Sequence, residues 1–127
     1  MRELIARFDV TAFDASTVPG VEGGWAAASL LRKTFTEGIL GESVVYFLYS
    51  GDEANRGYLA AEHITAAMPG GEPGTVTVHH WGTQFGEEST WGGVIITGTG
   101  TGPFAGWSGA APIEHDERGP FFRFTLD

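Results

Sequence analysis

Short runs of β-branched and aromatic residues alternate along the chain with clusters of glycine, proline and aspartate. Runs of this kind, bounded by turn residues, are typical of β-strands. Their regular spacing favours an antiparallel meander over βαβ units, which need crossover helices. The pattern predicts about eight strands, at Leu4–Phe13, Trp25–Thr36, Ser43–Tyr49, Gly57–Ala66, Thr75–Phe85, Thr90–Thr97, Phe104–Ala110 and Phe121–Leu126.

One segment, Ala26–Lys33, could also form a helix, because it contains residues of high helix propensity. It is short, however, and it continues directly into Thr34-Phe35-Thr36, which favours a strand. We therefore predict a strand there.

Alternation within the strands indicates which side chains face inward. In Thr75–Phe85, Val76 and Val78 share a face with His80, so His80 is predicted inward and His79 outward. The last strand has an apolar face of its own, made of Phe122, Phe124 and Leu126.

Two other strands are less clear-cut. In Gly57–Ala66 both faces carry mixed side chains, so alternation alone leaves the orientation of Glu62 open. Ser43–Tyr49 is apolar on both faces, which is expected of a strand with a packed outer surface or a strand at a subunit interface.

Glycine makes up 20 of the 127 residues, and several glycines fall where a small sheet has to bend. A sheet of eight strands exposes two edges unless it closes on itself, and closure leaves an interior wide enough for side chains or one small ligand. The predicted fold is therefore all-β: a single domain over residues 1–127, forming a small closed antiparallel eight-stranded barrel with up-and-down connections. The length fits one domain.

Composition excludes several classes of function. The chain has no cysteine, which excludes disulfides, thiolate metal sites and a cysteine nucleophile. Seven Lys and Arg against 16 Asp and Glu give a net charge of −9, which argues against nucleic acid and against a polybasic membrane patch. With no apolar stretch near ~18 residues and no signal-peptide pattern at the N-terminus, the expectation is a soluble cytoplasmic protein.

From Ser29 onward the chain resembles short bacterial proteins of unknown function related to allene oxide cyclase, a calycin-like β-barrel superfamily. The order and spacing of several short motifs carry this resemblance over about four-fifths of the chain. They are Ser29, Lys33-Thr34-Phe35-Thr36-Glu37-Gly38, Leu40-Gly41-Glu42-Ser43, Glu62 with Ile64, Gly74-Thr75-Val76-Thr77-Val78 leading to His80, Trp91, Gly98-Thr99-Gly100-Thr101-Gly102, Gly106, Gly109, His115 and Leu126-Asp127.

The resemblance implies a barrel, with Glu62 and His80 on the side of the lumen. It also suggests, by analogy at the level of the fold, cyclisation or isomerisation of apolar molecules. The chain departs from the family pattern at His63 and around His115, where the family has Glu-Arg-Ile and tends towards His-Gly-His.

Glu62 and His80 are the candidate catalytic pair. A carboxylate in an apolar interior has a raised pKa, and a neighbouring imidazole can share its proton, so the pair could act as general acid and base. The alternative is a structural hydrogen-bonded pair, because buried polar groups need partners. The aromatic residues predicted to bind substrate are Tyr46, Tyr58, Trp91, Phe122 and Phe124, although aromatic side chains also fill the core of any small barrel.

No cofactor and no metal is expected. His79 and His80 point to opposite faces, as do Glu62 and His63, so regular strands do not converge them on one ion. The string from Gly100 to Ala105 matches a dinucleotide fingerprint, but no helix can start after it because Pro103 and Gly106 follow.

The leading hypothesis is a small-molecule cyclase or isomerase acting on a mostly apolar substrate in the lumen, with a place in natural-product biosynthesis. The alternatives are a non-catalytic, lipocalin-like binding protein and a structural homo-oligomer whose barrel is filled by side chains. The expected partner is a small apolar ligand, with no nucleic acid and no membrane.

Overall fold

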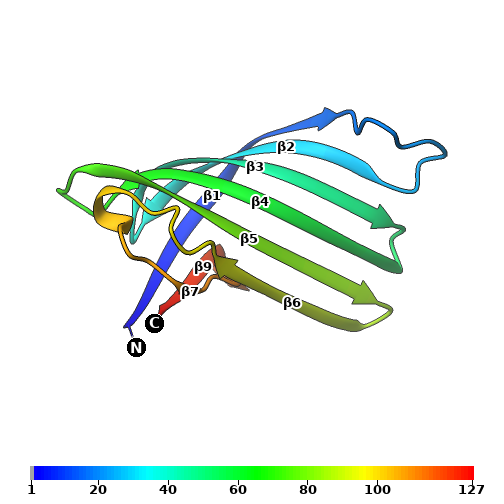
Figure 1. Ribbon diagram of the computed structural model, residues 1–127. Coiled ribbons are helices and arrows are strands. Elements are labelled where there is room, and N and C mark those ends of the chain that lie inside the picture. The colour runs from blue at the N-terminus through cyan, green and yellow to red at the C-terminus, as the bar shows by residue number, and fades with distance from the viewer. Residues whose placement is uncertain (1) are drawn as a thin grey trace.

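The computed structural model describes residues 2–127, which fold into one antiparallel sheet of nine strands (Figure 1). The strands follow one another along the chain with a single 3₁₀ turn between β6 and β7. They are β1 (Arg2–Ser16), β2 (Ala27–Glu37), β3 (Leu40–Gly51), β4 (Asn55–Ala67), β5 (Pro73–Phe85), β6 (Glu88–Ile95), η1 (Gly102–Phe104), β7 (Gly109–Ala110), β8 (Ile113–Asp116) and β9 (Gly119–Leu126). None of the helical segments among these residues is long and apolar enough to cross a membrane.

The sheet is joined into a ring of hydrogen-bonded strands. Strands β1 to β6 pair in sequence order, and β9 then pairs with β1, opposite residues 2–7. The other edge of β9 takes both β7 and β8, which lie end to end along it. All-β antiparallel architecture is therefore confirmed, but the order β7-β9-β8 departs from the expected simple meander of eight strands.

The strand predicted at Phe104–Ala110 is wrong for most of its length. Residues 102–104 form a 3₁₀ turn, and only residues 109–110 extend as a strand. Pro103 fixes the backbone and lacks an N–H, so the chain turns here and buries Phe104 and Trp107 in the core. Strand β8 was not predicted, because its acidic sequence resembles a turn; it forms a hairpin with β9, which follows it directly in the chain.

The segment that competed as a helix is confirmed as a strand, and so are the predicted inward faces of two others. His80 is buried while its neighbour His79 is exposed. Phe122, Phe124 and Leu126 are all buried in the main core. Alternation therefore identifies the inner face correctly wherever a strand has one clearly apolar side.

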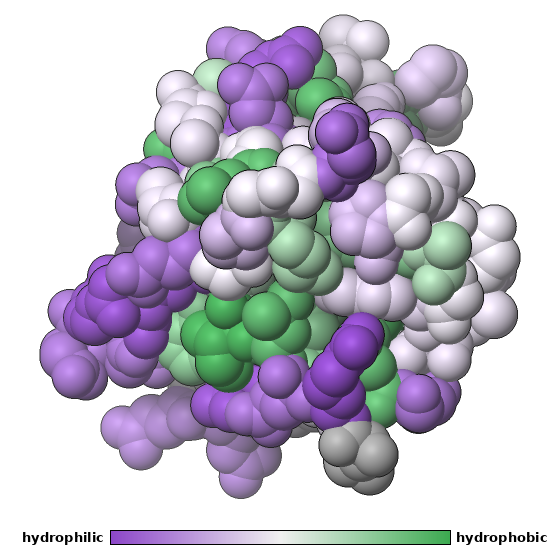
Figure 2. Space-filling model, turned by 90° about the vertical axis from the view of Figure 1, so that its left-hand side faces the viewer, coloured by the Kyte–Doolittle hydropathy of each residue, from purple (hydrophilic) through white to green (hydrophobic). Residues whose placement is uncertain are grey.

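The main core fills one end of the ring. It is built from stacked and edge-to-face aromatic pairs, such as Phe122 on Phe124 at 5.1 Å and Phe104 on Trp107 at 4.9 Å between ring centroids. Figure 2 looks onto this end, where apolar side chains (green) and hydrophilic ones (purple) pack side by side. We call it the closed end.

We call the opposite end, at the right of Figure 1, the open end, because the strand pairing between β1 and β6 is incomplete there. Strand β1 pairs with β9 only over residues 2–7, and β6 pairs with β7 only at Val94 and Ile95. Beyond these positions, within residues 2–127, neither strand pairs with another strand on that side, although the Gly93 carbonyl still accepts from the Ala111 N–H at 2.9 Å. Gly93 lies where the gap closes: an added Cβ would come within 2.0 Å of the Ala111 carbonyl oxygen, so only glycine allows this approach.

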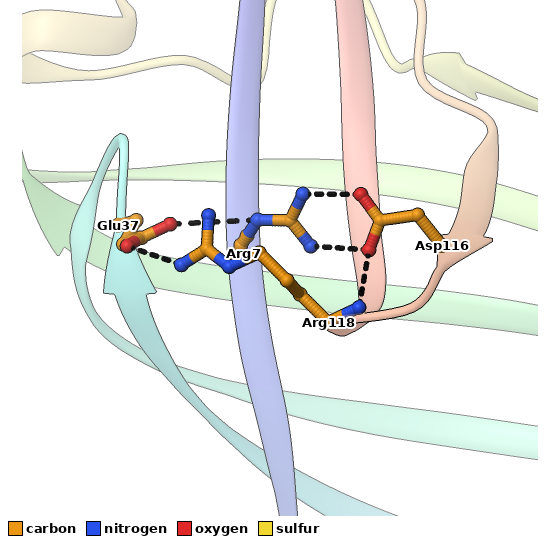
Figure 3. Close-up of polar contacts among 4 residues, drawn as sticks. All are labelled: Arg7, Glu37, Asp116 and Arg118. Atoms are coloured by element: carbon orange, nitrogen blue, oxygen red, sulfur yellow. Dashed lines mark hydrogen bonds and ion pairs between the residues drawn. The ribbon is translucent and has the colours of Figure 1, made fainter.

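A cluster of ion pairs fastens the seam at which β1 changes partner from β9 to β2 (Figure 3). Arg7 donates to both carboxylate oxygens of Asp116, at 2.9 and 2.5 Å, and lies 3.4 Å from Glu37. Arg118, from the β8–β9 turn, donates to Glu37 at 2.6 Å. The cluster thus ties β1 to the ends of β2 and β8.

This seam gives the protein a specific acid sensitivity. The hydrogen bond from Arg7 lowers the pKa of Asp116 from 3.8 to about 2. The carboxylate therefore contributes stability above pH 3.8, and the contribution is lost as the pH falls towards about 2. We expect the urea midpoint of the native protein to exceed that of Asp116→Asn at pH 5, with the gap closing by pH 2. Asp9→Asn, on the same strand as Arg7, is the control; a gap unchanged between pH 5 and pH 2 would contradict the assignment.

Candidate functional site

A group of buried polar side chains lies inside the ring, between the closed-end core and the open end. It comprises Lys33 on β2, Ser43 on β3, Glu62 on β4 and His80 on β5, each at most 4% exposed. Their strands are neighbours in the sheet, and all four side chains occupy inward positions of the alternation. Polar groups this deeply buried are stable only when they satisfy one another.

Glu62 is the centre of the group. Its Oε1 accepts from Lys33 Nζ at 2.8 Å and lies 2.9 Å from His80 Nε2, while its Oε2 accepts from Ser43 Oγ at 2.6 Å. Both carboxylate oxygens are therefore occupied. The Lys33 ammonium also lies 4.0 Å from the centre of the Phe8 ring, so the cation is enclosed by its counter-ion and aromatic faces.

His80 connects this ion pair to a tyrosine. Its second ring nitrogen, Nδ1, lies 3.1 Å from the hydroxyl oxygen of Tyr58. The Tyr58 ring reaches this position by lying over Gly82, where an added Cβ would come within 2.8 Å of the ring. A continuous chain of hydrogen bonds thus runs from Lys33 through Glu62 and His80 to Tyr58.

The electrostatics of the group fix the direction of these bonds. Burial raises the pKa of Glu62, but the Lys33 charge and the bonds from His80 and Lys33 outweigh it and hold this pKa below its ordinary value. Burial lowers the pKa of Lys33 by more than Glu62 raises it. Burial, together with the nearby Lys33 charge, also holds the pKa of His80 below its ordinary value despite the bond to Glu62. At neutral pH His80 is therefore uncharged: Nε2–H donates to the Glu62 carboxylate, and Nδ1 accepts from the Tyr58 hydroxyl.

Burial, followed by the negative charge of Glu62, raises the pKa of Tyr58 to about 12. Its phenol therefore stays protonated at neutral pH, as the bond to His80 Nδ1 requires. The chain ends in a neutral O–H group with a base directly behind it.

A cavity of about 1130 Å³ occupies the open end. Its wall carries five aromatic side chains: Phe13, Phe47, Tyr49, Tyr58 and Trp91. Tyr58 is the member of the hydrogen-bonded chain that lines this cavity; within residues 2–127 the lining includes neither Glu62 nor His80. The tyrosine thus stands between the buried ion pair and the space available to a ligand.

The structure separates the residues predicted from the sequence into four groups. Glu62 and His80 are in contact, and Tyr58 and Trp91 line the cavity. Phe122 and Phe124 lie in the closed-end core instead of on the cavity wall. Tyr46 is on the outer face, 46% exposed, so the prediction that it shapes the lumen is wrong; its strand is apolar on both sides, and only register decides which side faces in.

Lys33 and Ser43 were missed as site residues. Both lie in motifs that carry the family resemblance, and Lys33 is the only lysine in the chain. These are the features of the sequence that could have identified them as site residues. Ser29, in another of these motifs, is 1% exposed, and its Oγ has no hydrogen-bond partner among residues 2–127. A metal is not suggested by the geometry: among residues 2–127, no three His, Asp or Glu side chains are grouped to hold an ion.

Comparison with known proteins gives a family match along nearly the whole chain. Residues 4–127 match the family described as "Protein of unknown function (DUF3224)". A crystal structure of a protein of unknown function from Shewanella oneidensis MR-1, of the same family, superimposes with a TM-score of 0.81 at 20% identity, covering 100% of this chain and 98% of that one. At this identity the likeness shows the fold. No curated protein matches.

Proposed function

The chain belongs to the DUF3224 family, whose function is unknown, and we propose that it is a cofactor-independent isomerase or cyclase for a mostly apolar small molecule. In this proposal the closed sheet acts as a β-barrel of the allene oxide cyclase-like, calycin-like kind, with the open end as its substrate site. The observation that carries the proposal is the chain Lys33–Glu62–His80–Tyr58, which brings one polarised hydroxyl to the wall of an aromatic cavity.

The proposed chemistry is a reversible proton transfer. A proton that leaves the substrate passes to the Tyr58 oxygen while the proton of Tyr58 passes to His80 Nδ1. The imidazolium that forms is stabilised by the Glu62 carboxylate 2.9 Å away. Return of a proton to another substrate atom restores the resting state, so the product is an isomer of the substrate and no co-reactant is consumed.

Lys33 and Ser43 are positioning residues in this scheme. They hold the Glu62 carboxylate charged and fixed, and Glu62 in turn fixes the tautomer of His80. Burial of these charged and polar groups has a large desolvation cost. Apolar residues of similar volume would fill the core with equal or greater stability, so packing alone does not require this arrangement.

A second candidate is binding without chemistry. Phe13 and Trp91, which line the cavity, are 60% and 55% exposed. The site is therefore more accessible to water than is favourable for a reaction that requires water to be excluded. The cavity volume supports both ligand-based proposals over a barrel filled entirely by side chains.

Exposure of the purified protein to an apolar metabolite fraction distinguishes the two candidates. The enzyme proposal expects a compound to be replaced by a product of identical mass and different chromatographic retention, and heat-unfolded protein should leave it unchanged. A compound that is retained by the protein and recovered chemically unaltered would overturn the catalytic proposal in favour of binding.

A further inference from the structure

Negative charge is concentrated at the open end. Carboxylates occupy the strand ends and turns there: Asp14, Glu22, Asp52, Glu53, Glu87 and Glu88. None of them takes part in an ion pair within the described residues, 2–127. Asp52 and Glu53 line the cavity itself, and the other four lie on neighbouring strand ends and turns. Negative charge in and around a cleft concentrates ligands of positive charge there.

Within residues 2–127, one Arg or Lys side chain lies at the cavity with these carboxylates. Arg56 also lines the cavity, but its guanidinium is held by the backbone oxygen of Glu53 and by Gln84, each at 2.9 Å. Lys33 does not line the cavity and is paired with Glu62, so it adds no net charge. The cavity therefore keeps an excess of negative charge at its mouth.

The cavity wall itself favours positive charge. The rings of Phe47 and Tyr58 stack at 4.8 Å, and Phe13 and Tyr49 pack against Phe47 at 6.5 and 5.5 Å. The indole of Trp91, carried by β6, completes the lining. Aromatic faces carry the negative part of the ring quadrupole, so several rings around one space attract a cation that has lost much of its water.

We propose that the ligand of this cavity is an organic cation, an apolar body that bears a tertiary or quaternary ammonium group. The inference rests on the proposed function in one respect, that the cavity is where the small molecule binds. Charge and aromatic lining select the same class independently: the carboxylates attract the ammonium to the mouth, and the rings hold it where carboxylates do not reach. An anion of the same shape would be repelled both by the carboxylates and by the aromatic faces.

Three probes that share a benzyl group and a tetrahedral head test the proposal: benzyltrimethylammonium, its neutral isostere neopentylbenzene, and phenylmethanesulfonate. Calorimetry and tryptophan fluorescence at low and at physiological salt give their dissociation constants. We expect the cation to bind about tenfold more tightly than the neutral isostere at low salt, and the sulfonate to bind least. Added salt should reduce the preference for the cation over the neutral isostere but not remove it, because salt does not screen the attraction between the cation and the aromatic rings.

Two variants locate the effect. Trp91→Leu keeps an apolar wall but removes an aromatic face, and Glu53→Gln removes a charge at the mouth; each should reduce the preference for the cation severalfold. Glu72→Gln, in the β4–β5 turn at the closed end, is the matched control and should not change it.

The outcomes separate the two proposals. Equal binding of the cation and the neutral isostere overturns the cation preference and leaves the cavity as a ligand site. Tightest binding of the sulfonate overturns it as well and assigns recognition to Arg56. Failure of all three probes to bind contradicts both this inference and the ligand cavity on which it rests.

Discussion

Replacement of Glu62 by glutamine is expected to destabilise the protein by about 3 kcal/mol or more at pH 7. The amide keeps the size of the side chain but removes its charge, so the Lys33 ammonium, 4% exposed, is left without its counter-ion. A buried cation whose partner is removed costs more than the pair itself contributes, because the desolvation is no longer compensated. Urea unfolding monitored by circular dichroism measures the difference.

The loss of stability caused by Glu62→Gln should become smaller as the pH rises. Burial already lowers the pKa of Lys33, and loss of the carboxylate lowers this pKa further. The unfolded chain then binds more protons than the folded one, so the stability of the variant rises with pH until the free lysine also titrates near 10.5. The difference in the free energy of unfolding between the variant and the native protein should therefore decrease between pH 7 and pH 10.

A double variant provides the control. Lys33→Met combined with Glu62→Gln removes the buried cation as well, so it should be more stable than Glu62→Gln alone at pH 7. If Glu62→Gln loses less than about 1 kcal/mol, or if the double variant is the weaker of the two, the ion pair is not the central interaction of this group.

Tyr58→Phe is expected to reduce turnover of the true substrate by about 10²-fold or more while leaving its binding nearly unchanged. The variant retains the ring that stacks on Phe47 and removes the hydroxyl that links His80 to the cavity. Because one buried hydrogen bond is lost, we expect a stability change of only about 1 kcal/mol. Steady-state kinetics should place the loss in kcat and not in KM.

Two other tyrosines are controls for this variant. Tyr49→Phe alters the same cavity away from the His80 contact, and Tyr46→Phe alters the outer face. Both should keep their activity. The pH dependence provides a further check: activity requires neutral His80, whose pKa burial holds below 6.5, so it should persist below pH 6.5 and fall only in more acidic solution. Wild-type turnover by Tyr58→Phe would remove the tyrosine from the mechanism.

The predictable part of the fold is the part in which each strand has one clearly apolar face. Val76 and Val78 place His80 inward by alternation alone, and Phe122 and Phe124 identify the inner side of β9. The segment around Phe104 was not predictable, because its turn depends on contacts made after closure. An added Cβ at Gly74, on β5, would come within 2.1 Å of the Thr101 carbonyl oxygen, and no local pattern reveals this proximity between residues far apart in sequence.

The candidate site was predicted in part for the same reason. Alternation places His80 inward, whereas Glu62 lies on a strand with mixed faces and only the family resemblance points it inward. Tyr46 and Tyr58 look equivalent in sequence. Register separates them: Tyr58 pairs opposite Gly82 and turns inward over it, while Tyr46 pairs opposite Ala61 on the outer face. Lys33 is an ordinary surface residue by type, and only burial beside Glu62 makes it part of the site.

By itself the sequence determined the all-β class, the inner face of the clearly amphipathic strands, and the absence of thiol chemistry, because these depend on residue type and local alternation. Only the tertiary structure decided that β9 closes the ring on β1, that one end is filled while the other holds a cavity of about 1130 Å³, and that three strands, β2, β4 and β5, bring Lys33, Glu62, His80 and Tyr58 into one chain of hydrogen bonds. The physical reason is that register and closure are set by the packing of residues far apart in sequence, and a shift of one residue would reverse every face.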